Sequence, residues 1–180
     1  MRKKKAAAEA AAVPKQPSLR SDLLALLIKL MVIAAALFLL ERFVFGVCSV
    51  RGNDMAPSIR DRDLAVYYRL DHTYEVRDVV AVRNRDGTLS ILRVVATAGD
   101  RVDITSDGLR INGYYQQEDY AAGETLEFVG GAVYPITLAD GEVFVLGDNR
   151  ENAVDSRYYG PVRTDDLLGK IITTIRRRDF

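Results

Sequence analysis

Residues 23–45 read LLALLIKLMVIAAALFLLERFVF, the only long apolar stretch in this chain of 180 residues. As an α-helix the stretch would be about 34 Å long at 1.5 Å per residue, enough to cross a hydrocarbon core of about 30 Å. Lys29 near one end, and Glu41 with Arg42 near the other, can extend their charged groups to the lipid headgroups. No second stretch is apolar enough to surround it as a buried helix, so we predict a transmembrane helix over residues 23–46.

The charge on either side of the apolar stretch predicts how the chain is oriented. Residues 1–22 contain six Lys or Arg residues and two acidic ones, whereas residues 43–180 contain 17 basic and 22 acidic residues. Positive flanks remain in the cytoplasm. We therefore expect a cytoplasmic tail over residues 1–22, a single pass through the plasma membrane, and an extracytoplasmic domain over residues 47–180. The lipid bilayer is the first predicted partner, and a mildly acidic domain does not indicate nucleic-acid binding.

Beyond residue 50 the sequence is typical of an antiparallel all-β domain. Short runs rich in β-branched residues alternate with turn residues, and no long amphipathic helix interrupts them. The predicted strands are Leu64–Tyr68, Val79–Arg83, Leu89–Val95, Leu109–Asn112, Leu126–Val129, Glu142–Leu146 and Lys170–Thr174. The predicted hairpin turns are Asp86-Gly87, Asp107-Gly108, Asn112-Gly113 and Asp140-Gly141. These features favour a barrel or a sandwich.

The chain has one cysteine and one histidine, Cys48 and His72. A single cysteine cannot form an intrachain disulfide, so the domain has to be stable without one. Lipid attachment to Cys48 is an alternative, but Phe45-Gly46-Val47 before it is a poor match to a lipobox, and an interfacial thiol is the simpler interpretation. One histidine does not make a zinc site, and the sequence predicts no metal and no organic cofactor.

Three motifs follow the apolar stretch: GNDMAP at 52–57, LRVVATAGD at 92–100 and GDNRENAVDSR at 147–157. Together they resemble the bacterial type I signal peptidases, which are membrane-anchored serine proteases that remove leader peptides with a Ser–Lys dyad. The residues that match the family motifs are Gly52, Met55, Pro57, Arg93, Val94, Val95, Gly99, Asp100, Gly147, Asp148, Asn149, Arg150, Asp155, Ser156 and Arg157. The resemblance implies the family's antiparallel β-fold beside one transmembrane helix.

The resemblance fails at the positions that carry the chemistry. Asp54 occupies the position of the nucleophilic serine, Leu92 that of the general-base lysine, and Ala153 that of a serine that can orient the lysine. A Ser–Lys dyad needs a hydroxyl and an amine that can lose its proton. Asp54 has no hydroxyl, Leu92 cannot accept a proton, and the neighbouring guanidinium of Arg93 does not release one in proteins.

Replacement catalytic groups are poorly placed in the sequence. Ser49 and Ser58 lie four or five residues from the nucleophile position, too far for attack geometry. Lys170 is the only lysine beyond the apolar stretch, and active relatives also contain a Gly-Lys pair there. An acid mechanism with Asp54 and Asp155 would need both carboxylates to act on one water, whereas the family resemblance implies that Asp155 belongs to a structural ion-pair network.

The retained residues divide into two predicted groups. In the family, the substrate lies extended between the strand edges that carry the nucleophile and the base, with Leu92 expected to face this groove. The corresponding groove residues are Gly52, Asn53, Met55, Pro57, Ile91 and Arg93. The corresponding ion-pair network consists of Asp148, Arg150, Asp155 and Arg157.

We therefore predict a catalytically inactive signal peptidase homologue that binds an extended segment of an exported protein. It is similar to the signal-peptidase-like proteins that assist pilin assembly in Gram-positive bacteria, so the expected client is a pilin or another preprotein. The alternatives are an active signal peptidase that removes signal peptides from secreted proteins, and a membrane-tethered β-domain with a purely structural role.

Overall fold

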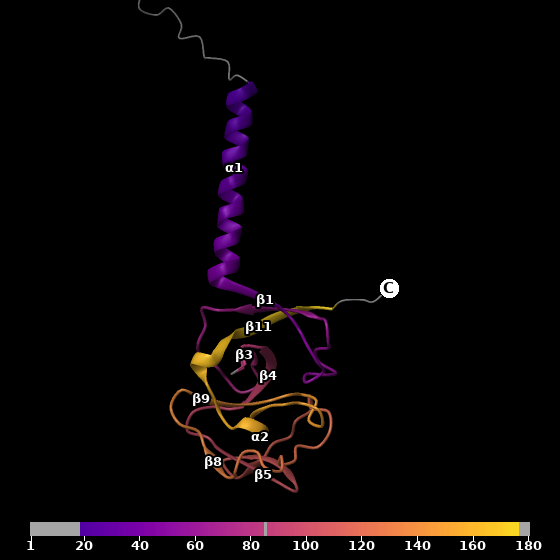
Figure 1. Ribbon diagram of the computed structural model, residues 1–180. Coiled ribbons are helices and arrows are strands. Elements are labelled where there is room, and N and C mark those ends of the chain that lie inside the picture. Colours follow the sequence, from indigo (N-terminus) through magenta and orange to yellow (C-terminus); the bar gives the residue numbers. More distant parts are fainter. Residues whose placement is uncertain (1–18, 85, 177–180) are drawn as a thin grey trace, which may run out of the picture. The chain divides into compact units, whose positions relative to one another are not determined.

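The computed structural model describes residues 19–84 and 86–176, and the chain divides into two compact units, residues 1–39 and 40–180. The first unit contains α1 (Leu19–Leu39), the long helix in Figure 1. Every side chain of α1 is exposed. An exposed helix that is apolar on all sides is unfavourable in water and suited to lipid. Together with the five-residue π-helical segment η1 (Leu40–Val44), it forms the one candidate membrane span in the described part of the chain.

The helical segment differs from the predicted one at both ends. It begins at Leu19, four residues earlier than predicted, and ends at Val44, so that Phe45 and Gly46 already belong to a strand, β1 (Phe45–Ser49). In this strand Gly46 pairs with Tyr67. A side chain at Gly46 would overlap the Tyr67 ring, which explains why a glycine stands where the chain changes from helix to strand.

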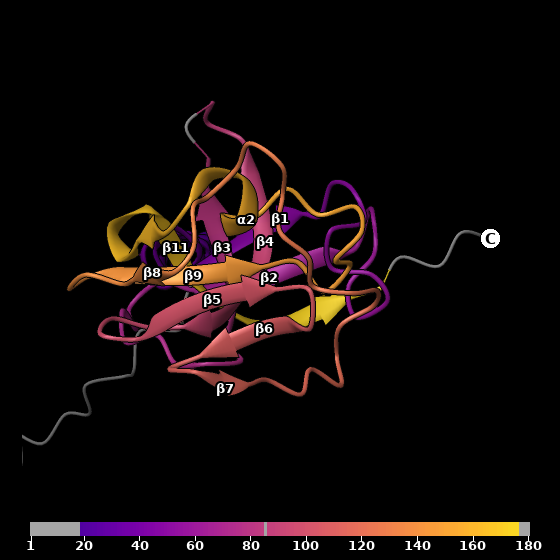
Figure 2. The same cartoon turned by 90° about the horizontal axis from the view of Figure 1, so that it is seen from below.

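The second unit is built from two antiparallel sheets (Figure 1). In order across the larger sheet, the strands are β1, β2 (Leu64–Tyr68), β11 (Leu167–Ile175), β3 (Val79–Arg83), β4 (Leu89–Ala96), β9 (Glu142–Leu146) and β10 (Val162–Arg163). The smaller sheet contains β7 (Tyr114–Tyr115), β6 (Gly108–Ile111), β5 (Arg101–Thr105) and β8 (Ile136–Thr137). Figure 2 shows β5, β6 and β7 side by side.

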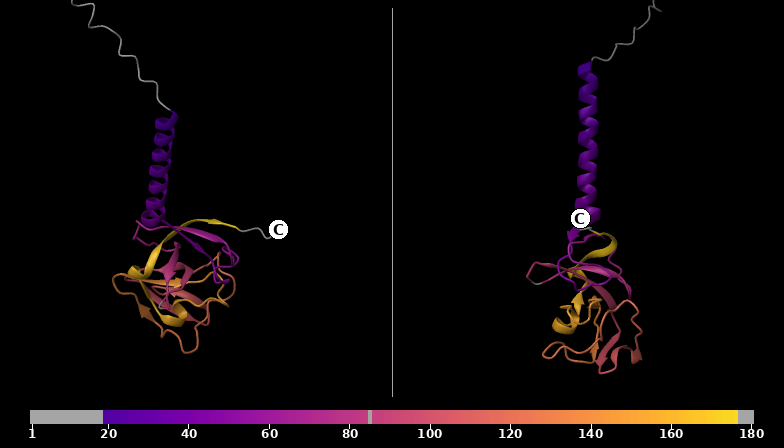
Figure 3. Two further views of the ribbon diagram at one scale, coloured as in Figure 1. Left: turned by 45° about the horizontal axis from the view of Figure 1, so that its top comes forward. Right: turned by 90° about the vertical axis from the view of Figure 1, so that its right-hand side faces the viewer.

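Strand β11, the last strand in the sequence, lies in the larger sheet between two strands from the first half of the chain. It runs between β2 and β3 as a long curved strand (Figure 3) and changes register against each of them. Gly169 lies at the register change against β3, at φ +144, and a side chain there would overlap the Tyr68 carbonyl. Such irregularities bend a strand and help a sheet to curl.

Strand β4 lies near the centre of the larger sheet and contributes to all three hydrophobic clusters. Leu92 and Val94 belong to one cluster, Ile91 to a second, and Val95 and Ala96 to a third. The register of β4 against β9 shifts between Val94 and Ala96. Because side chains alternate between the two faces of a strand, this shift turns the end of β4 toward the third cluster.

The predicted all-β class is confirmed, and three predicted strands have the predicted bounds, namely β2, β3 and β9. The strand predicted at Leu126–Val129 is wrong, because these residues form no strand. The turns at Asp86-Gly87, Asp107-Gly108 and Asn112-Gly113 each join neighbouring antiparallel strands, as predicted. Asp140-Gly141 instead precedes a strand of the other sheet, because it connects β8 to β9.

Two short helical turns complete the second unit, α2 (Ser156–Tyr159) and η2 (Thr164–Asp166). Asp155 caps α2, since its side chain accepts a hydrogen bond from the Arg157 N–H. This cap places Asp155 at the centre of the site described next.

Candidate functional site

The segment from Gly52 to Ile59 forms a compact turn that is fixed by backbone hydrogen bonds. The Ala56 N–H donates to the Asn53 carbonyl at 3.0 Å, and the Ile59 N–H donates to the Met55 carbonyl at 2.9 Å. Met55 is 1% exposed and packs in the same cluster as Ile91. The turn therefore uses Met55 as its anchor and leaves the Asp54 side chain partly exposed.

The segment from Gly147 to Asp155 packs directly against this turn. The Asn149 N–H donates to the Asp54 carbonyl at 2.8 Å, and the Asn149 amide donates to the Asn53 carbonyl at 3.1 Å. At Gly147, an added Cβ would lie 2.6 Å from the Asp54 carbonyl and would overlap the Ala153 methyl. Gly147 is therefore the residue that lets Asp54 and Ala153 approach each other.

Two ion pairs with buried carboxylates, Arg93–Asp148 and Arg157–Asp155, lie next to this contact. The Arg93 guanidinium donates to both carboxylate oxygens of Asp148, at 2.8 and 2.7 Å, and lies 4.4 Å from the Tyr120 ring centroid. The Arg157 guanidinium donates twice to Asp155, at 2.9 Å each. Bidentate pairs of this kind are geometrically specific. Asp155 also accepts from the Gly147 N–H at 3.0 Å, which ties this ion pair to the contact with Asp54.

A third ion pair uses a residue that the sequence did not indicate. Arg150 donates to the two oxygens of Glu118, with one contact at 2.7 Å, and also to the hydroxyl of Thr125. Arg157 connects this pair to the previous one by donating to the Arg150 carbonyl at 2.7 Å. Of the four residues expected to form one network, Asp148 and Arg150 each pair with a residue outside the set. We call the three pairs, Arg93–Asp148, Arg157–Asp155 and Arg150–Glu118, the ion-pair frame.

Leu92 lies in the hydrophobic core rather than on the surface of a groove. It has no exposed surface and packs in a cluster with Val80, Val94 and Val145, against which Tyr159 also packs. The expectation that Leu92 faces the groove therefore needs correction. On β4 the residues on the opposite face are Ile91, which contacts the Met55 cluster, and Arg93, which is held by Asp148.

A small groove adjoins Asp54 and shares no lining residue with the ion-pair frame. Its lining residues are Cys48, Ser49, Val50, Arg51, Asp54, Met55, Leu89 and Ile91. The groove brings together five residues that the sequence analysis singled out, Cys48, Ser49, Asp54, Met55 and Ile91. Its volume, about 10 Å³, is close to what one water molecule needs. It has room for one small group, such as a methyl.

Two ionisable groups that line the groove, Asp54 and Cys48, are poorly suited to act as nucleophiles. Burial raises the pKa of Asp54, and the negative charge of Asp155 raises it further. Burial also raises the pKa of the Cys48 thiol. A carboxylate is a weak nucleophile toward an amide, and a thiol attacks only as its thiolate, which a raised pKa makes scarcer.

Lys170 is committed to an ion-pair cluster of its own. Its amine lies 3.1 Å from Asp71 and 2.9 Å from Asp78. Burial lowers the pKa of Lys170, but the two carboxylates outweigh it and the net shift is upward. Since a general base must be able to lose its proton, this environment favours the inactive, charged form.

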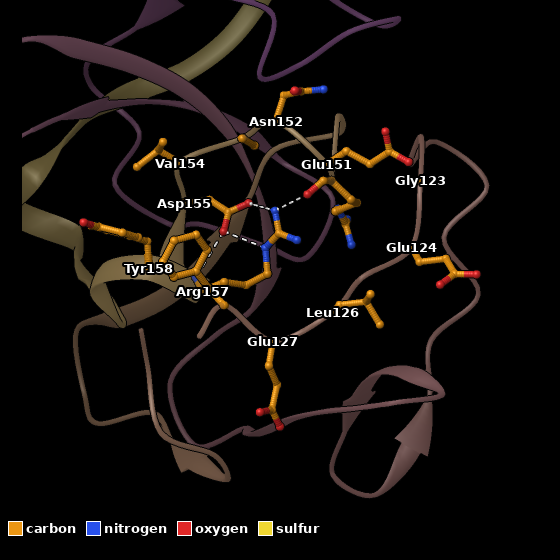
Figure 4. A pocket seen from close by; sticks show the side chains of 13 residues that line it. Gly123, Glu124, Leu126, Glu127, Glu151, Asn152, Val154, Asp155, Arg157 and Tyr158 are labelled. Atoms are coloured by element: carbon orange, nitrogen blue, oxygen red, sulfur yellow. Dashed lines mark hydrogen bonds and ion pairs between the residues drawn. The ribbon is translucent and has the colours of Figure 1, made fainter. Parts of the chain in front are cut away.

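A larger cavity of about 600 Å³ has Ala153 among its lining residues. Figure 4 shows this cavity from close by. Two segments enclose it, residues 123–128 and residues 150–158. Figure 4 shows the Arg157–Asp155 pair at its floor and Glu124, Glu127 and Glu151 around it. Residues 19–84 and 86–176 contain no group of three or more His, Cys, Asp or Glu side chains that could hold a metal ion.

The exposed apolar helix and the antiparallel β-domain fit a membrane-associated β protein. The family model described as signal peptidase, peptidase S26 matches residues 23–175. The chain therefore belongs to the signal peptidase (peptidase S26) family. Membership of this family and the single apolar helix fit a single-pass membrane protein.

Two sequence relatives agree with this assignment. The chain is similar to Signal peptidase IB of Staphylococcus aureus strain Mu50, with 25% identity over 170 residues, covering 85% of this chain and 89% of the relative. It is 32% identical over 139 residues to Signal peptidase I S of Bacillus subtilis strain 168, covering 72% of this chain and 76% of the relative. A crystal structure of a signal peptidase I from Enterococcus faecalis V583 is 30% identical, with a TM-score of 0.47, and covers 56% of this chain and 97% of that one.

Proposed function

We propose that this protein is a catalytically inactive member of the signal peptidase family, which holds an extended segment of an exported protein without cutting it. In this proposal α1 anchors the chain with residues 1–22 in the cytoplasm, and residues 47–180 meet the client outside. The observation that carries the proposal is the chemistry at three positions, where Asp54, Leu92 and Ala153 stand in place of the family's nucleophile, base and orienting serine.

The surroundings of these positions support the loss of cleavage. Leu92 is fully buried in the core, so its position does not present a group to a bound peptide. Lys170 is held in a charged state by Asp71 and Asp78. Asp54 has no hydroxyl, and its carboxyl group is a weak nucleophile toward an amide. A new dyad that used Lys170 would need an amine that already has two carboxylate partners.

The parts that position a peptide remain. The turn that contains Asp54 is anchored by Met55, and Gly147 keeps it in contact with the ion-pair frame. β1 lies at one edge of the larger sheet, next to the small groove. An extended peptide can add to such a sheet edge through main-chain hydrogen bonds, while a small cavity selects a small side chain. The client that this arrangement suits is an exported preprotein, and we extend the proposal to a pilin as one such client.

Cys48 provides a direct test of client binding, because it is the only cysteine and lines the groove. The rate at which a thiol reagent alkylates Cys48 is measured in the full-length protein in detergent, with and without a synthetic peptide that spans the cleavage region of a preprotein. We expect the peptide to slow alkylation severalfold, because an occupied groove covers the thiol.

A matched control separates coverage of the groove from a general effect on reactivity. In a Cys48→Ser background, Ser106→Cys places the thiol on an exposed turn outside the groove. The same peptide should leave alkylation of this variant unchanged. Equal alkylation of Cys48 with and without the peptide would contradict the proposed binding site.

The alternative is an active signal peptidase, which the names of the relatives favour. The two functions differ in what happens to the bound preprotein. Under the proposed function a preprotein protects Cys48 and stays intact, whereas an active enzyme would release a shortened product at one site.

A further inference from the structure

The 600 Å³ cavity beside Ala153 is separate from the small groove and differs from it in character (Figure 4). It is open to solvent and is large enough for one long side chain with part of its neighbour. Its two walls meet where the Glu151 side chain lies against Gly123: a Cβ on Gly123 would be 2.8 Å from the Cγ of Glu151.

The floor of this cavity carries no spare positive charge. Its two arginines, Arg150 and Arg157, are bound to Glu118 and Asp155 in the ion-pair frame. Their side chains are 0% and 8% exposed, so they act as part of the protein interior. An anion entering the cavity would therefore meet cations that are already neutralised.

The rim, by contrast, carries three carboxylates without a partner. Glu124, Glu127 and Glu151 line the cavity and are all exposed. Within residues 19–84 and 86–176 none of the three has an ion pair or a side-chain hydrogen bond. Three uncompensated negative charges around one opening attract a cation and disfavour an anion.

Aromatic and aliphatic side chains line the same opening. Phe128 and Tyr158 form an edge-to-face pair with ring centroids 4.8 Å apart, and each is about half exposed, at 50% and 53%. Leu126 and Val154 extend this surface at 46% and 57% exposure. Exposed aromatic faces next to carboxylates are suited to Arg and Lys side chains, whose stems are apolar and whose heads are cationic.

We propose that this cavity is a second docking site, which takes an Arg or Lys side chain and an adjoining apolar residue from the exported client. The partner's chemistry follows from charge complementarity, since the rim is acidic and the floor is neutral. Its identity as the client rests on the proposed function and on continuity: the Ala153 methyl lines this cavity, and only Gly147 separates it from the Asp54 carbonyl at the other site.

The test uses two fluorescent peptides, acetyl-Ala-Leu-Arg-Leu-Ala-amide and the same peptide with citrulline in place of arginine, which removes the charge but keeps the shape. Binding to the full-length protein in a nonionic detergent is measured by fluorescence anisotropy. The variant is Glu124→Gln with Glu127→Gln and Glu151→Gln. The control variant, Glu75→Gln with Asp140→Asn and Asp166→Asn, changes the net charge equally at exposed carboxylates elsewhere.

We expect the arginine peptide to bind the native protein and the control variant with equal affinity. The rim variant should lose about tenfold in affinity, as should the citrulline peptide on the native protein, because several exposed charge contacts and a cation–aromatic contact are lost together. The difference between the peptides should shrink at high ionic strength.

Equal binding of the two peptides, or an equal loss in the control and rim variants, would overturn this site. A change of oligomeric state in the rim variant would identify a second copy of the chain as the occupant and would also contradict the proposal. If Cys48 protection persists while the arginine peptide fails to bind, the cavity proposal falls and the groove stands. The reverse result would remove the proposed client binding and leave a cation-binding cavity.

Discussion

The two sides of residues 147–157 differ in the groups that they bring together: one side holds paired charges, and the other holds neither a hydroxyl nor an amine. On one side, Asp148, Asp155 and Arg157 have partners that complement them in charge and geometry. On the other side, Ala153 and Asp54 meet through Gly147 without a hydroxyl or an amine between them. Under the proposed function, the ion-pair frame has been kept while the groups that serve only bond cleavage have been replaced. The site would then serve to hold a peptide rather than to cut it.

The largest effect is expected from breaking the frame. Arg157→Ala leaves Asp155, which is 0% exposed, as a buried charge without its partner. We expect a loss of about 3–5 kcal/mol in the free energy of unfolding. Chemical denaturation of the full-length protein in detergent, followed by tyrosine fluorescence, measures this change.

Arg163→Ala is the matched control, because the Arg163–Asp165 pair is 3.4 Å long with side chains 65% and 81% exposed. An exposed pair of this kind contributes about 0–1 kcal/mol. Similar effects for the two substitutions would mean that the frame is not a stabilising structure.

The next largest effect on stability is expected from substitutions of Leu92. Leu92→Ala should destabilise the protein by about 2–5 kcal/mol, because it leaves a cavity in a closed core. Leu92→Met, which nearly conserves volume, should cost less than about 1.5 kcal/mol. The same denaturation experiment compares them. If Leu92→Ala were neutral, Leu92 would line an open groove and the core assignment would be wrong.

A smaller, pH-dependent effect is expected at Asp54. Its pKa is raised in the folded protein above the ordinary value of 3.8, so the folded state holds this proton more tightly than the unfolded state does. Stability therefore falls as the pH rises from 3.8 through the raised pKa. Asp54→Asn removes this loss.

The variant should thus be more stable than the native protein at pH 7 and no more stable at pH 3. Denaturation midpoints at the two pH values, measured for both proteins, check this. A native protein that is more stable than the variant at pH 7 would show that the Asp54 carboxylate has a favourable partner.

The fold was predictable where strands are continuous runs of β-branched residues, as in β2, β3 and β9. Strand β1 was not, because Phe45–Ser49 continues an apolar stretch and only its pairing with β2 makes it a strand. Residues 126–129 are mostly apolar, as is typical of a strand, yet Leu126 and Phe128 line the 600 Å³ cavity instead.

The sequence indicated which motifs form the site, but not which of their residues pair with one another. The substitutions at Asp54 and Leu92 are visible in the sequence, but the pairing of Arg93 with Asp148 joins residues 55 positions apart. Glu118 lies in a segment without a motif, and only folding brings it to Arg150. A local pattern cannot specify such contacts, since they depend on how β4, β9 and the loops between them pack.

The most direct measurement is the mass spectrum of a preprotein after prolonged incubation with the full-length protein in lipid vesicles. The proposed function predicts one mass, that of the intact preprotein, for the native protein and for Asp54→Ala alike. A single shortened product that forms with the native protein and disappears with Asp54→Ala would contradict it.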